Sequence, residues 1–457
     1  MMLGVIGIII SLVLLMYLAY RGITVLILAP VLALLAVLFS GDLPLLVTYT
    51  EIFMKDFAGY AKTYFPLFLL GAVFGKVMDD SGAAKSIANF IANKLGKDKA
   101  ILAVVLSCAV LTYGGVSLFV VAFAVYPIAV ELFKEANLPK RLVPGSIALG
   151  AFTFTMTALP GSPQIQNAIP MTYFGTTAWA APVLGVIASI VMFTLGMMWL
   201  NGRAKKAAAA GEGYGNHKEE KLETLDESKL PNIFVAIAPI VVVLVLNYIL
   251  GRYFGNMPGE YLKKYGTSVD KVKGLWSLIV ALIISIVLAI ILMRKNFKSV
   301  IKTINDGAIG SLLAIANTSS EVGYGNVIKA LGAFALIKSA ILAIPGTPLI
   351  SLSFSTSILA GITGSASGGM SIALGALGDI YMQKAVVLGI NPEAFHRIAA
   401  IACGGFDTLP HNGAVITLLG ITGLTHKESY VDIGMCTVII PVAATIVCII
   451  AASFGIV

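Results

Sequence analysis

Uninterrupted apolar runs recur along the chain, each close to the length of about 20 residues that a helix needs to cross a bilayer. A second kind of apolar stretch is interrupted by Gly, Pro, Ser and Thr and is unsuited to one straight crossing. This pattern predicts an all-α polytopic membrane protein. The uninterrupted runs lie at 3–20, 23–40, 178–201, 232–250, 275–294 and 432–456, and the interrupted ones at 62–78, 100–134, 142–176, 308–328, 349–386 and 394–424.

The two halves of the chain resemble each other in sequence. Three short matches follow in one order at nearly one offset of residue numbers. We therefore expect two repeats, 1–201 and 232–457, joined by the Lys- and Glu-rich segment 202–231. The matches pair Phe74-Gly75-Lys76-Val77 with Tyr324-Gly325-Asn326-Val327, Gly114-Gly115-Val116-Ser117-Leu118 with Gly368-Gly369-Met370-Ser371-Ile372, and Leu159-Pro160-Gly161-Ser162 with Leu409-Pro410-His411-Asn412.

Each repeat has the same predicted order of elements: two long spans, a third span, a Gly-rich segment, a crossing broken at Leu-Pro, and a closing span. The Gly-rich segments, 100–134 and 349–386, are too long for one crossing and too interrupted for two. If each is a re-entrant hairpin, every repeat crosses the membrane five times. Because five is odd, the second repeat must be inverted. The closing spans are 178–201 and 432–456.

The basic residues indicate how the chain is oriented. The N-terminus runs into apolar residues without a basic segment or cleavage signal, so we expect a retained span rather than a signal peptide. Most of the 31 lysines and arginines fall in segments that this topology places inside. The prediction is a bacterial inner (plasma) membrane protein with both termini on the outer side and a cytoplasmic linker at 202–231.

Composition excludes several other classes of protein. The chain is 58% hydrophobic and 12% charged, whereas soluble domains carry about 25% charged residues. Its net charge of +8 forms no basic stripe with interleaved aromatics, so we expect no nucleic-acid partner. No zinc-protease, phosphate-loop or nucleophile-elbow motif is present, and no enzyme, metal or cofactor is expected. All four cysteines lie in apolar segments without ligand-like spacing: Cys108, Cys403, Cys436 and Cys448.

Four helix breaks fall at apolar depth, at 113–115, 157–161, 365–369 and 407–411. Each would free backbone N–H groups at a helix start, which attract an anion without any Lys or Arg. The alternatives are ordinary Gly/Pro kinks and hydroxyls bonded to their own helix. The predicted substrate-binding residues are Thr112, Gly114, Gly115, Ser117, Thr157, Gly161, Ser162, Gln164, Asn167, Ser365, Ser367, Gly368, Gly369, Ser371, Thr408, His411, Asn412 and Gly413.

Ionisable residues in the interrupted stretches are the candidates for proton coupling, because a charge within a membrane is costly and usually functional. Asp407 and His411 lie in the second Leu-Pro break, and Glu321 is a second buried-acid candidate. The alternative is that Asp407 only caps a helix and His411 only donates a hydrogen bond. His396 and Arg397 are expected at the membrane interface.

The segment Gly404-Gly405-Phe406-Asp407-Thr408-Leu409-Pro410-His411-Asn412-Gly413-Ala414-Val415-Ile416-Thr417, with Gly368-Gly369-Met370-Ser371 and His396-Arg397, resembles the gluconate permease (GntP) family of proton-coupled carboxylate symporters within the ion transporter superfamily. It is most similar to the hydroxybutyrate permease branch. The resemblance implies an elevator mechanism, a homodimer held by the scaffold spans, and transport elements at 62–176 and 308–424. Dicarboxylate relatives bind sodium at Ser-Asn-Thr hairpin tips, which this chain lacks.

The expected function is therefore proton symport of a small organic anion, such as gluconate, 3-hydroxybutyrate or a related monocarboxylate. The expected partners are that anion, the coupling ion, the lipid bilayer and a second copy of the chain. Sodium-coupled symport of the same substrates is the alternative within transport. A channel or passive exporter, and less so a membrane-embedded enzyme, are the alternatives outside it.

Overall fold

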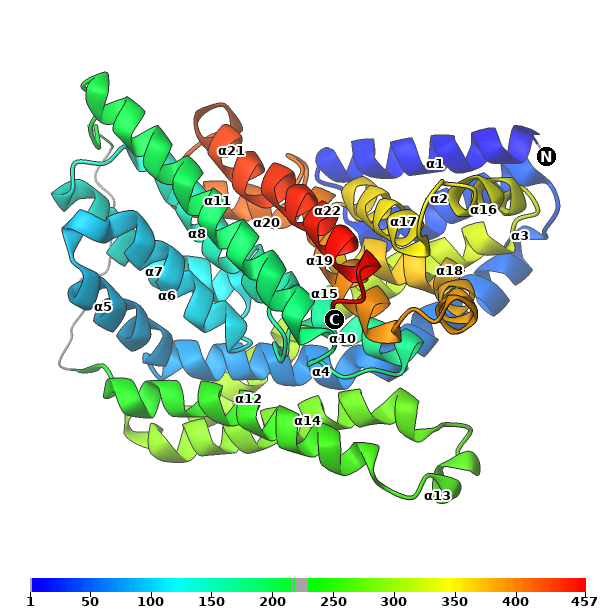
Figure 1. Cartoon of the computed structure of the whole chain (residues 1–457), viewed down its shortest axis with the longest axis horizontal. Coiled ribbons are helices and arrows are strands. Elements are labelled where there is room, and N and C mark those ends of the chain that lie inside the picture. Colours follow the sequence, from blue (N-terminus) through cyan, green and yellow to red (C-terminus); the bar gives the residue numbers. More distant parts are fainter. Residues whose placement is uncertain (1, 216, 218–228) are drawn as a thin grey trace.

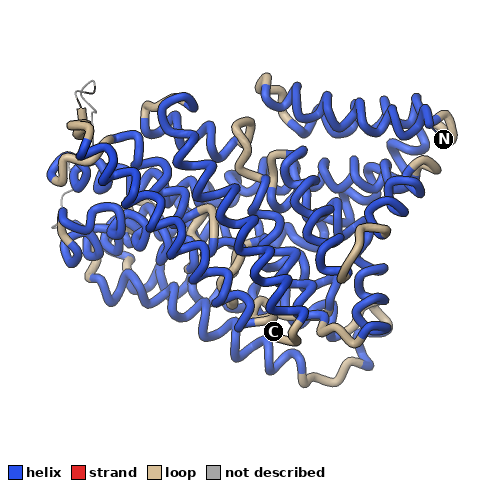
Figure 2. The backbone as a smooth tube through the Cα atoms, turned by 45° about the horizontal axis from the view of Figure 1, so that its top comes forward, coloured by secondary structure: helices blue, strands red, loops and turns tan. Residues whose placement is uncertain are grey.

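The computed structural model describes residues 2–215, 217 and 229–457, and every regular element among them is helical (Figures 1 and 2). Part of the predicted linker, residue 216 and residues 218–228, lies outside the described residues. The first half contains α1 (Met2–Tyr20), α2 (Val25–Ser40), α3 (Leu45–Val47), a π-helical turn (Thr48–Phe53), α4 (Met54–Asp80), α5 (Ala83–Leu95), α6 (Ala100–Tyr113), α7 (Leu118–Glu135), α8 (Val143–Ala151), α9 (Phe154–Thr157), α10 (Ile165–Phe174) and α11 (Pro182–Ala209).

The second half repeats much of this order. Short 3₁₀ turns occur in the first half at Lys97–Lys99 and Lys140–Leu142, and in the second half at Arg294–Asn296. The helices are α12 (Ile233–Gly255), α13 (Glu260–Lys263), α14 (Val269–Leu292), α15 (Val300–Ala330), α16 (Phe334–Leu342), α17 (Pro348–Thr363), α18 (Ala366–Leu388), α19 (Pro392–Phe406), α20 (Gly413–Thr422), α21 (His426–Gly434), a π-helical turn (Met435–Ile439) and α22 (Ile440–Ser453).

Seven helical segments in the described chain are long and apolar enough to cross a membrane, and eight if α15 and α16, bent by 96°, form one span. Three further apolar helices, α2, α17 and α20, are shorter, at 10–17 residues. The protein is therefore a multi-pass membrane protein. The predicted count of ten crossings remains a prediction, because it depends on how the shorter helices sit in a bilayer.

Helix is interrupted at all four predicted breaks, and the local sequence explains why. In the first broken crossing, α9 ends at Thr157 and α10 begins at Ile165. Pro160 lacks a backbone N–H, and Gly161 adopts φ +84, which suits glycine. In the second, α19 ends at Phe406 and α20 begins at Gly413, with Pro410 between them.

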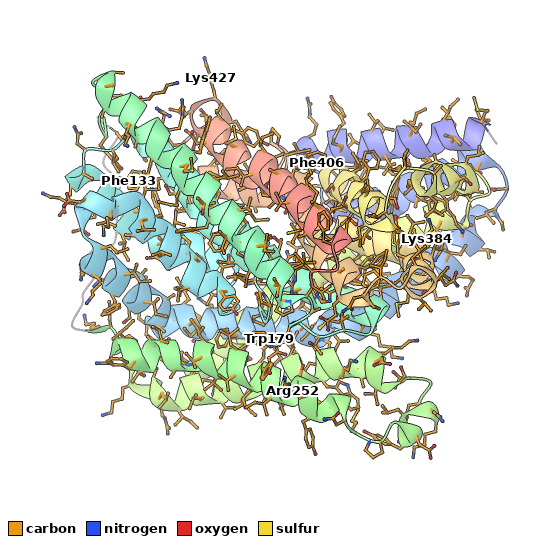
Figure 3. The ribbon with its side chains drawn as sticks, in the orientation of Figure 1. Phe133, Trp179, Arg252, Lys384, Phe406 and Lys427 are labelled. Carbon is orange, nitrogen blue, oxygen red and sulfur yellow. The ribbon has the colours of Figure 1, made fainter. Side chains whose placement is uncertain are left out.

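The apolar side chains are arranged as lipid requires. Large hydrophobic residues on the outer helices are exposed, including Phe234 at 81% and Ile291 at 66%, and Figure 3 shows such side chains pointing outward all along α12 and α14. Meanwhile many polar side chains are buried inside the helix assembly. A water-soluble protein would expose these two classes the other way round.

Helix α4 packs along α15, so the third long helices of the two halves lie side by side. Glycine allows their close approach, since a Cβ on Gly307 would lie 2.8 Å from the Cα of Val73. At one end the Thr303 hydroxyl donates to Asp80 Oδ2 over 2.7 Å. Helices α12 and α14 pair with each other and form a layer along one side of α4 (Figure 1).

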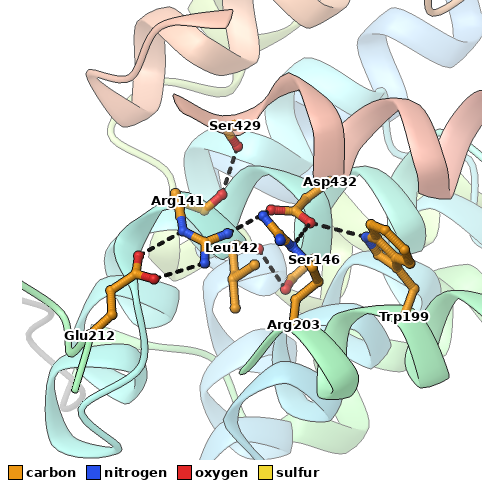
Figure 4. Close-up of polar contacts among 8 residues, drawn as sticks. All are labelled: Arg141, Leu142, Ser146, Trp199, Arg203, Glu212, Ser429 and Asp432. Carbon is orange, nitrogen blue, oxygen red and sulfur yellow. Dashed lines mark hydrogen bonds and ion pairs between the residues drawn. The ribbon is translucent and has the colours of Figure 1, made fainter. Parts of the chain in front are cut away.

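A buried ion network joins three elements at one end of the molecule (Figure 4). The Asp432 carboxylate of α21 has a side-chain exposure of 0% and accepts from Arg141 Nη1 at 3.1 Å and from Arg203 Nε at 2.9 Å. It also accepts from Trp199 Nε1 at 3.0 Å. Arg141 in turn donates through both Nε and Nη2 to Glu212. Two cations and two anions therefore balance, and the network ties α11 to α21.

Candidate functional site

The tip of the hairpin formed by α17 and α18 is the first part of the candidate site. Ser365 caps α18, its hydroxyl accepting the Gly368 N–H at 3.0 Å. The carboxyl group of Glu321, on α15, packs against Gly368 so closely that any side chain there would overlap Oε2. Glu321 is 4% exposed, and Oε2 has no hydrogen-bond partner in the described chain. The structure thus brings Glu321 to the hairpin tip.

The second broken crossing meets the same tip. Asn412 Nδ2 donates to Gly364 O at 2.8 Å, while Asn412 Oδ1 accepts from the backbone N–H groups of Ala414 and Val415. The His411 ring lies beside Gly364, with Cδ2 3.0 Å from where a Cβ would stand. One carboxamide therefore both caps α20 and fastens the hairpin tip to the broken crossing.

Asp407 follows the last turn of α19 and is 4% exposed. Its Oδ1, like His411 Nε2, has no hydrogen-bond partner among the described residues. Neighbouring Thr408 bonds to the Thr437 hydroxyl at 2.7 Å instead of facing open space. Glu321 and Asp407 are thus two buried carboxyl groups on different helices, each with one oxygen that has no partner among the described residues.

The first half shows the same arrangement with other side chains. Gln164 Nε2 donates to Thr112 O at 2.8 Å and to Val116 O at 3.3 Å, which fastens the α6–α7 tip to the first broken crossing. Tyr113 Oη donates to Pro160 O at 2.8 Å. Thr112 is fully buried, and its hydroxyl has no partner within the described part of the chain. The described residues of this tip, 112–117, include no aspartate or glutamate.

The two broken crossings touch each other. A Cβ on Gly404 would lie 2.9 Å from Thr157 Cγ2, so α19 packs directly against α9. The Thr157 hydroxyl bonds to Thr153 O within its own helix. Helix α4 closes the other side of the first tip, where Gly75 lies against the Ser117 N–H.

Several predicted binding residues have structural contacts instead of open space around them. Gly114 faces Ile240, Gly115 faces Pro163, Gly161 faces the Trp179 ring, and Gly369 faces the backbone of Ala360. Among the predicted glycines, only Gly413 has nothing within 4 Å of the position that a Cβ would take. The hydroxyls of Ser117, Ser162 and Ser365 accept backbone N–H groups of their own turns. Ser367, at the start of α18, stays a predicted binding residue.

His396 and Arg397, which the sequence places at the membrane interface, are both fully buried within the protein, and their depth in the bilayer stays a prediction. Helix α19 begins at Pro392, and one turn later its inner face is covered by the connection between α10 and α11. Asn167 belongs to this cluster: its Oδ1 contacts Arg397 Nη1 at 3.0 Å and His396 Nε2 at 3.1 Å. Its Nδ2 donates to Ser162 O and Ala178 O.

Tyr60 is a residue that sequence reasoning missed. It lies on α4, is 5% exposed, and sits near both Ser371 and Glu321. Its hydroxyl and that of Ser371 have no hydrogen-bond partner in the part of the chain that the structure describes. A tyrosine in an apolar span is unremarkable in sequence. Tyr60 becomes a candidate only because the packing of α4 along α15 brings it near Glu321.

The fold and the buried polar site together define a multi-pass membrane transporter. Residues 1–454 match the GntP family permease, so the chain belongs to the GntP permease family. It is 47% identical over 449 residues to YxjC of Bacillus subtilis (strain 168), an uncharacterized transporter, covering 94% of this chain and 95% of that one. An uncharacterized transporter of Haemophilus influenzae is 29% identical over 180 residues, 39% of this chain and 40% of that protein. These relatives are transporters, not enzymes.

Two solved structures share the fold. The YdaH transporter of Alcanivorax borkumensis aligns with a TM-score of 0.59 at 15% identity, covering 91% of this chain and 90% of that one. MtrF of Neisseria gonorrhoeae, which belongs to a class of antimetabolite efflux pumps, aligns with a TM-score of 0.53 at 12% identity, covering 89% and 83%. At these identities the likeness concerns the fold alone.

Proposed function

We propose that this GntP permease is a proton symporter for a small organic anion such as gluconate, 3-hydroxybutyrate or a related hydroxy- or monocarboxylate. The observation that carries the proposal is the pair of buried carboxyl groups, Glu321 and Asp407, each with an oxygen that lacks a partner in the described chain. An unpaired carboxylate is costly in such a place, and a protonated carboxyl group costs far less. Both groups therefore suit proton uptake and release, and the His411 ring lies at the same hairpin tip as Glu321.

The anion is proposed to bind at the helix starts around the two tips. At α20, Asn412 takes the N–H groups of Ala414 and Val415 and leaves that of Gly413 free for a ligand. At α10, the capping residue Gln164 makes no side-chain bond to the helix start. The unpartnered hydroxyls of Thr112, Ser371 and Tyr60 would receive the hydroxyl groups of the substrate.

An elevator mechanism with inverted repeats is the proposed means of transport. In its support, the order of elements is shared: α4 and α15, the α6–α7 and α17–α18 hairpins, and the two broken crossings occupy equivalent places in the two halves. Helices α1, α2, α12 and α14 would form the scaffold of a homodimer. In the inner membrane, both termini would then lie outside and the linker 202–231 in the cytoplasm.

Transport by purified protein in proteoliposomes tests the proposal. An inside-alkaline pH gradient should drive accumulation of labelled gluconate or 3-hydroxybutyrate, and a sodium gradient at equal pH should not. Accumulation that follows sodium alone would establish the sodium symporter instead. Conductance without counterflow would establish a channel or passive exporter.

A further inference from the structure

Arg397 is a fully buried cation whose hydrogen-bond partners are all neutral. Nε donates to Ala180 O at 3.1 Å, Nη2 to Ala180 O at 2.7 Å and to Ala178 O at 3.2 Å, and Nη1 to Asn167 Oδ1 at 3.0 Å. Among the described residues no carboxylate lies within ion-pair distance of it. Four hydrogen bonds use four of its five N–H groups, yet no carboxylate of the described chain forms an ion pair with it.

Glu393, the nearest acid along α19, forms no ion pair with Arg397. Glu393 lies one turn before Arg397, close enough to interact with it through space, but its Oε2 accepts the Ala181 N–H at 2.8 Å. Elsewhere in the same protein, Arg141 and Arg203 share the buried Asp432 carboxylate directly. Arg397 is therefore handled differently from the two arginines of the ion network.

The neighbouring histidine adds no negative charge and no positive one. Asn167 Nδ2 donates to two carbonyls, Ser162 O and Ala178 O, which fixes the orientation of its amide. Its Oδ1 must then accept from His396 Nε2, so that nitrogen carries the proton. His396 Nδ1 accepts the Thr176 hydroxyl at 2.6 Å. A neutral imidazole satisfies both bonds, so Arg397 is the one charged member of the group formed by Arg397, His396 and Asn167, and Glu393 lies one turn away.

This charge lies directly behind the first broken crossing. Ala178 O accepts both Arg397 Nη2 and the Gly161 N–H, the latter at 2.8 Å. Pro160 Cδ and Arg397 Nε lie 3.1 and 3.3 Å from the position that a Cβ on Gly185 would take. Tyr113 of the first hairpin tip bonds to Pro160 O from the other side.

We propose that Arg397 is a positioning residue whose fixed charge draws the substrate anion to the first broken crossing without touching it. The inference rests on the proposed function, since it requires an anionic substrate. Charges in a low-dielectric interior interact over longer distances than in water. Without substrate, the cation has only Glu393, one turn away and not ion-paired, as a nearby negative charge among the described residues, and a bound carboxylate adds a second. The first half, which lacks an acid at its tip, would hold the anion, and the second half the coupling proton.

Two pairs of variants separate charge from packing. Arg397→Gln removes the charge, and Arg397→Lys keeps it with fewer hydrogen bonds. Cys448→Asp leaves Arg397 intact but adds a carboxylate near it, with Cys448→Asn as the isosteric control. Cys448 is fully buried, and its Sγ lies 3.5 Å from Leu184 O, next to Gly185, which faces Arg397 Nε.

The measurements are the half-saturating concentration for counterflow of labelled gluconate and 3-hydroxybutyrate in proteoliposomes, and the melting temperature of the anion-free protein. Arg397→Gln and Cys448→Asp should raise the half-saturating concentration about tenfold, as expected when a favourable charge interaction is lost. Arg397→Lys should fall between Arg397→Gln and the unmodified protein. Cys448→Asp should melt above Cys448→Asn, because the added carboxylate compensates the cation.

Three outcomes overturn the inference. Equal half-saturating concentrations for Cys448→Asp and Cys448→Asn would show that the charge does not act on the anion. If Cys448→Asp does not fold, equal losses of affinity in Arg397→Lys and Arg397→Gln would show that the residue is only a structural clasp. If the unmodified protein exchanges neither anion, the proposed function fails first, and this inference fails with it.

Discussion

Buried carboxyl groups are the residues on which the proposed coupling depends. Glu321 lies on α15 at the tip of the α17–α18 hairpin and Asp407 at the end of α19, and each keeps one oxygen without a partner in the described chain. Their surroundings differ: Glu321 packs against Gly368, whereas Asp407 lies beside Thr408 at the end of a helix. The two groups can therefore be tested separately.

Asp407→Asn should abolish proton-driven accumulation while sparing counterflow, because the amide keeps the shape of the side chain but cannot exchange a proton. Uptake driven by a pH gradient and exchange at equal pH are measured on the same proteoliposomes. Normal accumulation by Asp407→Asn would exclude Asp407 as the coupling residue. Glu321→Gln, measured alongside, shows whether the second carboxyl group is also required.

Gly368→Ala should destabilise the protein by about 1–3 kcal/mol, the usual cost of overpacking, because the new methyl group would overlap the Glu321 carboxyl group. Combining it with Glu321→Ala should cost less than the two single changes added together. Melting temperatures in detergent measure both. Gly420→Ala is the control, since nothing lies within 4 Å of that Cβ position. Strict additivity would mean that the two residues do not touch.

At the scale of elements, the breaks in helix were predictable and the contacts across them were not. Pro160 and Pro410 cannot donate to the helix ladder, and Gly115 and Gly161 adopt positive φ, so the sequence itself marks these positions. The burial of Arg397 depends on the α10–α11 connection folding over α19. No local pattern encodes that contact, so the sequence alone did not predict that Arg397 is fully buried within the protein.

The same limit applies to the site. Glu321, Asp407 and His411 were predictable as ionisable residues in apolar stretches. The sequence did not predict that Gln164 and Asn412 bond to the hairpin tips. Its pattern indicates only that both residues contact substrate. Tertiary contacts between elements distant in sequence decide such roles.

The ion network between α11 and α21 makes a prediction about stability. Asp432→Asn should cost about 1–3 kcal/mol, because it removes the buried carboxylate that two partly exposed arginines share. Glu212→Gln, on the exposed side of the same network, should cost less than about 1 kcal/mol. Denaturation in detergent compares the two. Equal effects would contradict the assignment of Asp432 as the centre of the network.

The pH dependence of the exposed side follows from the same contacts. Hydrogen bonds from Arg141 hold the pKa of Glu212 below its ordinary value. Its contribution to stability is therefore fully present above the ordinary pKa of glutamate. It is lost as the pH falls through the lowered value, so Glu212→Gln should differ from the unmodified protein at neutral pH and not in acid.

At the scale of the whole molecule, the proposed orientation can be tested with cysteines, because the four native ones are buried. Phe454→Cys places an exposed thiol near the C-terminus, and Ala210→Cys places one in the linker 202–231, where α11 ends. A membrane-impermeant maleimide should label Phe454→Cys in intact spheroplasts and Ala210→Cys only after permeabilisation. The reverse result would invert the proposed topology.

Each hairpin tip is fastened to its neighbouring broken crossing by a carboxamide, Gln164 in one half and Asn412 in the other. A carboxamide has no formal charge, so releasing either fastener does not itself move charge through the electric field of the membrane. One elementary charge crossing 100 mV corresponds to about 2.3 kcal/mol, and neither release event incurs that energy. Any voltage dependence of the cycle must then arise from the cargo, the coupling ion and the fixed charges that travel with them.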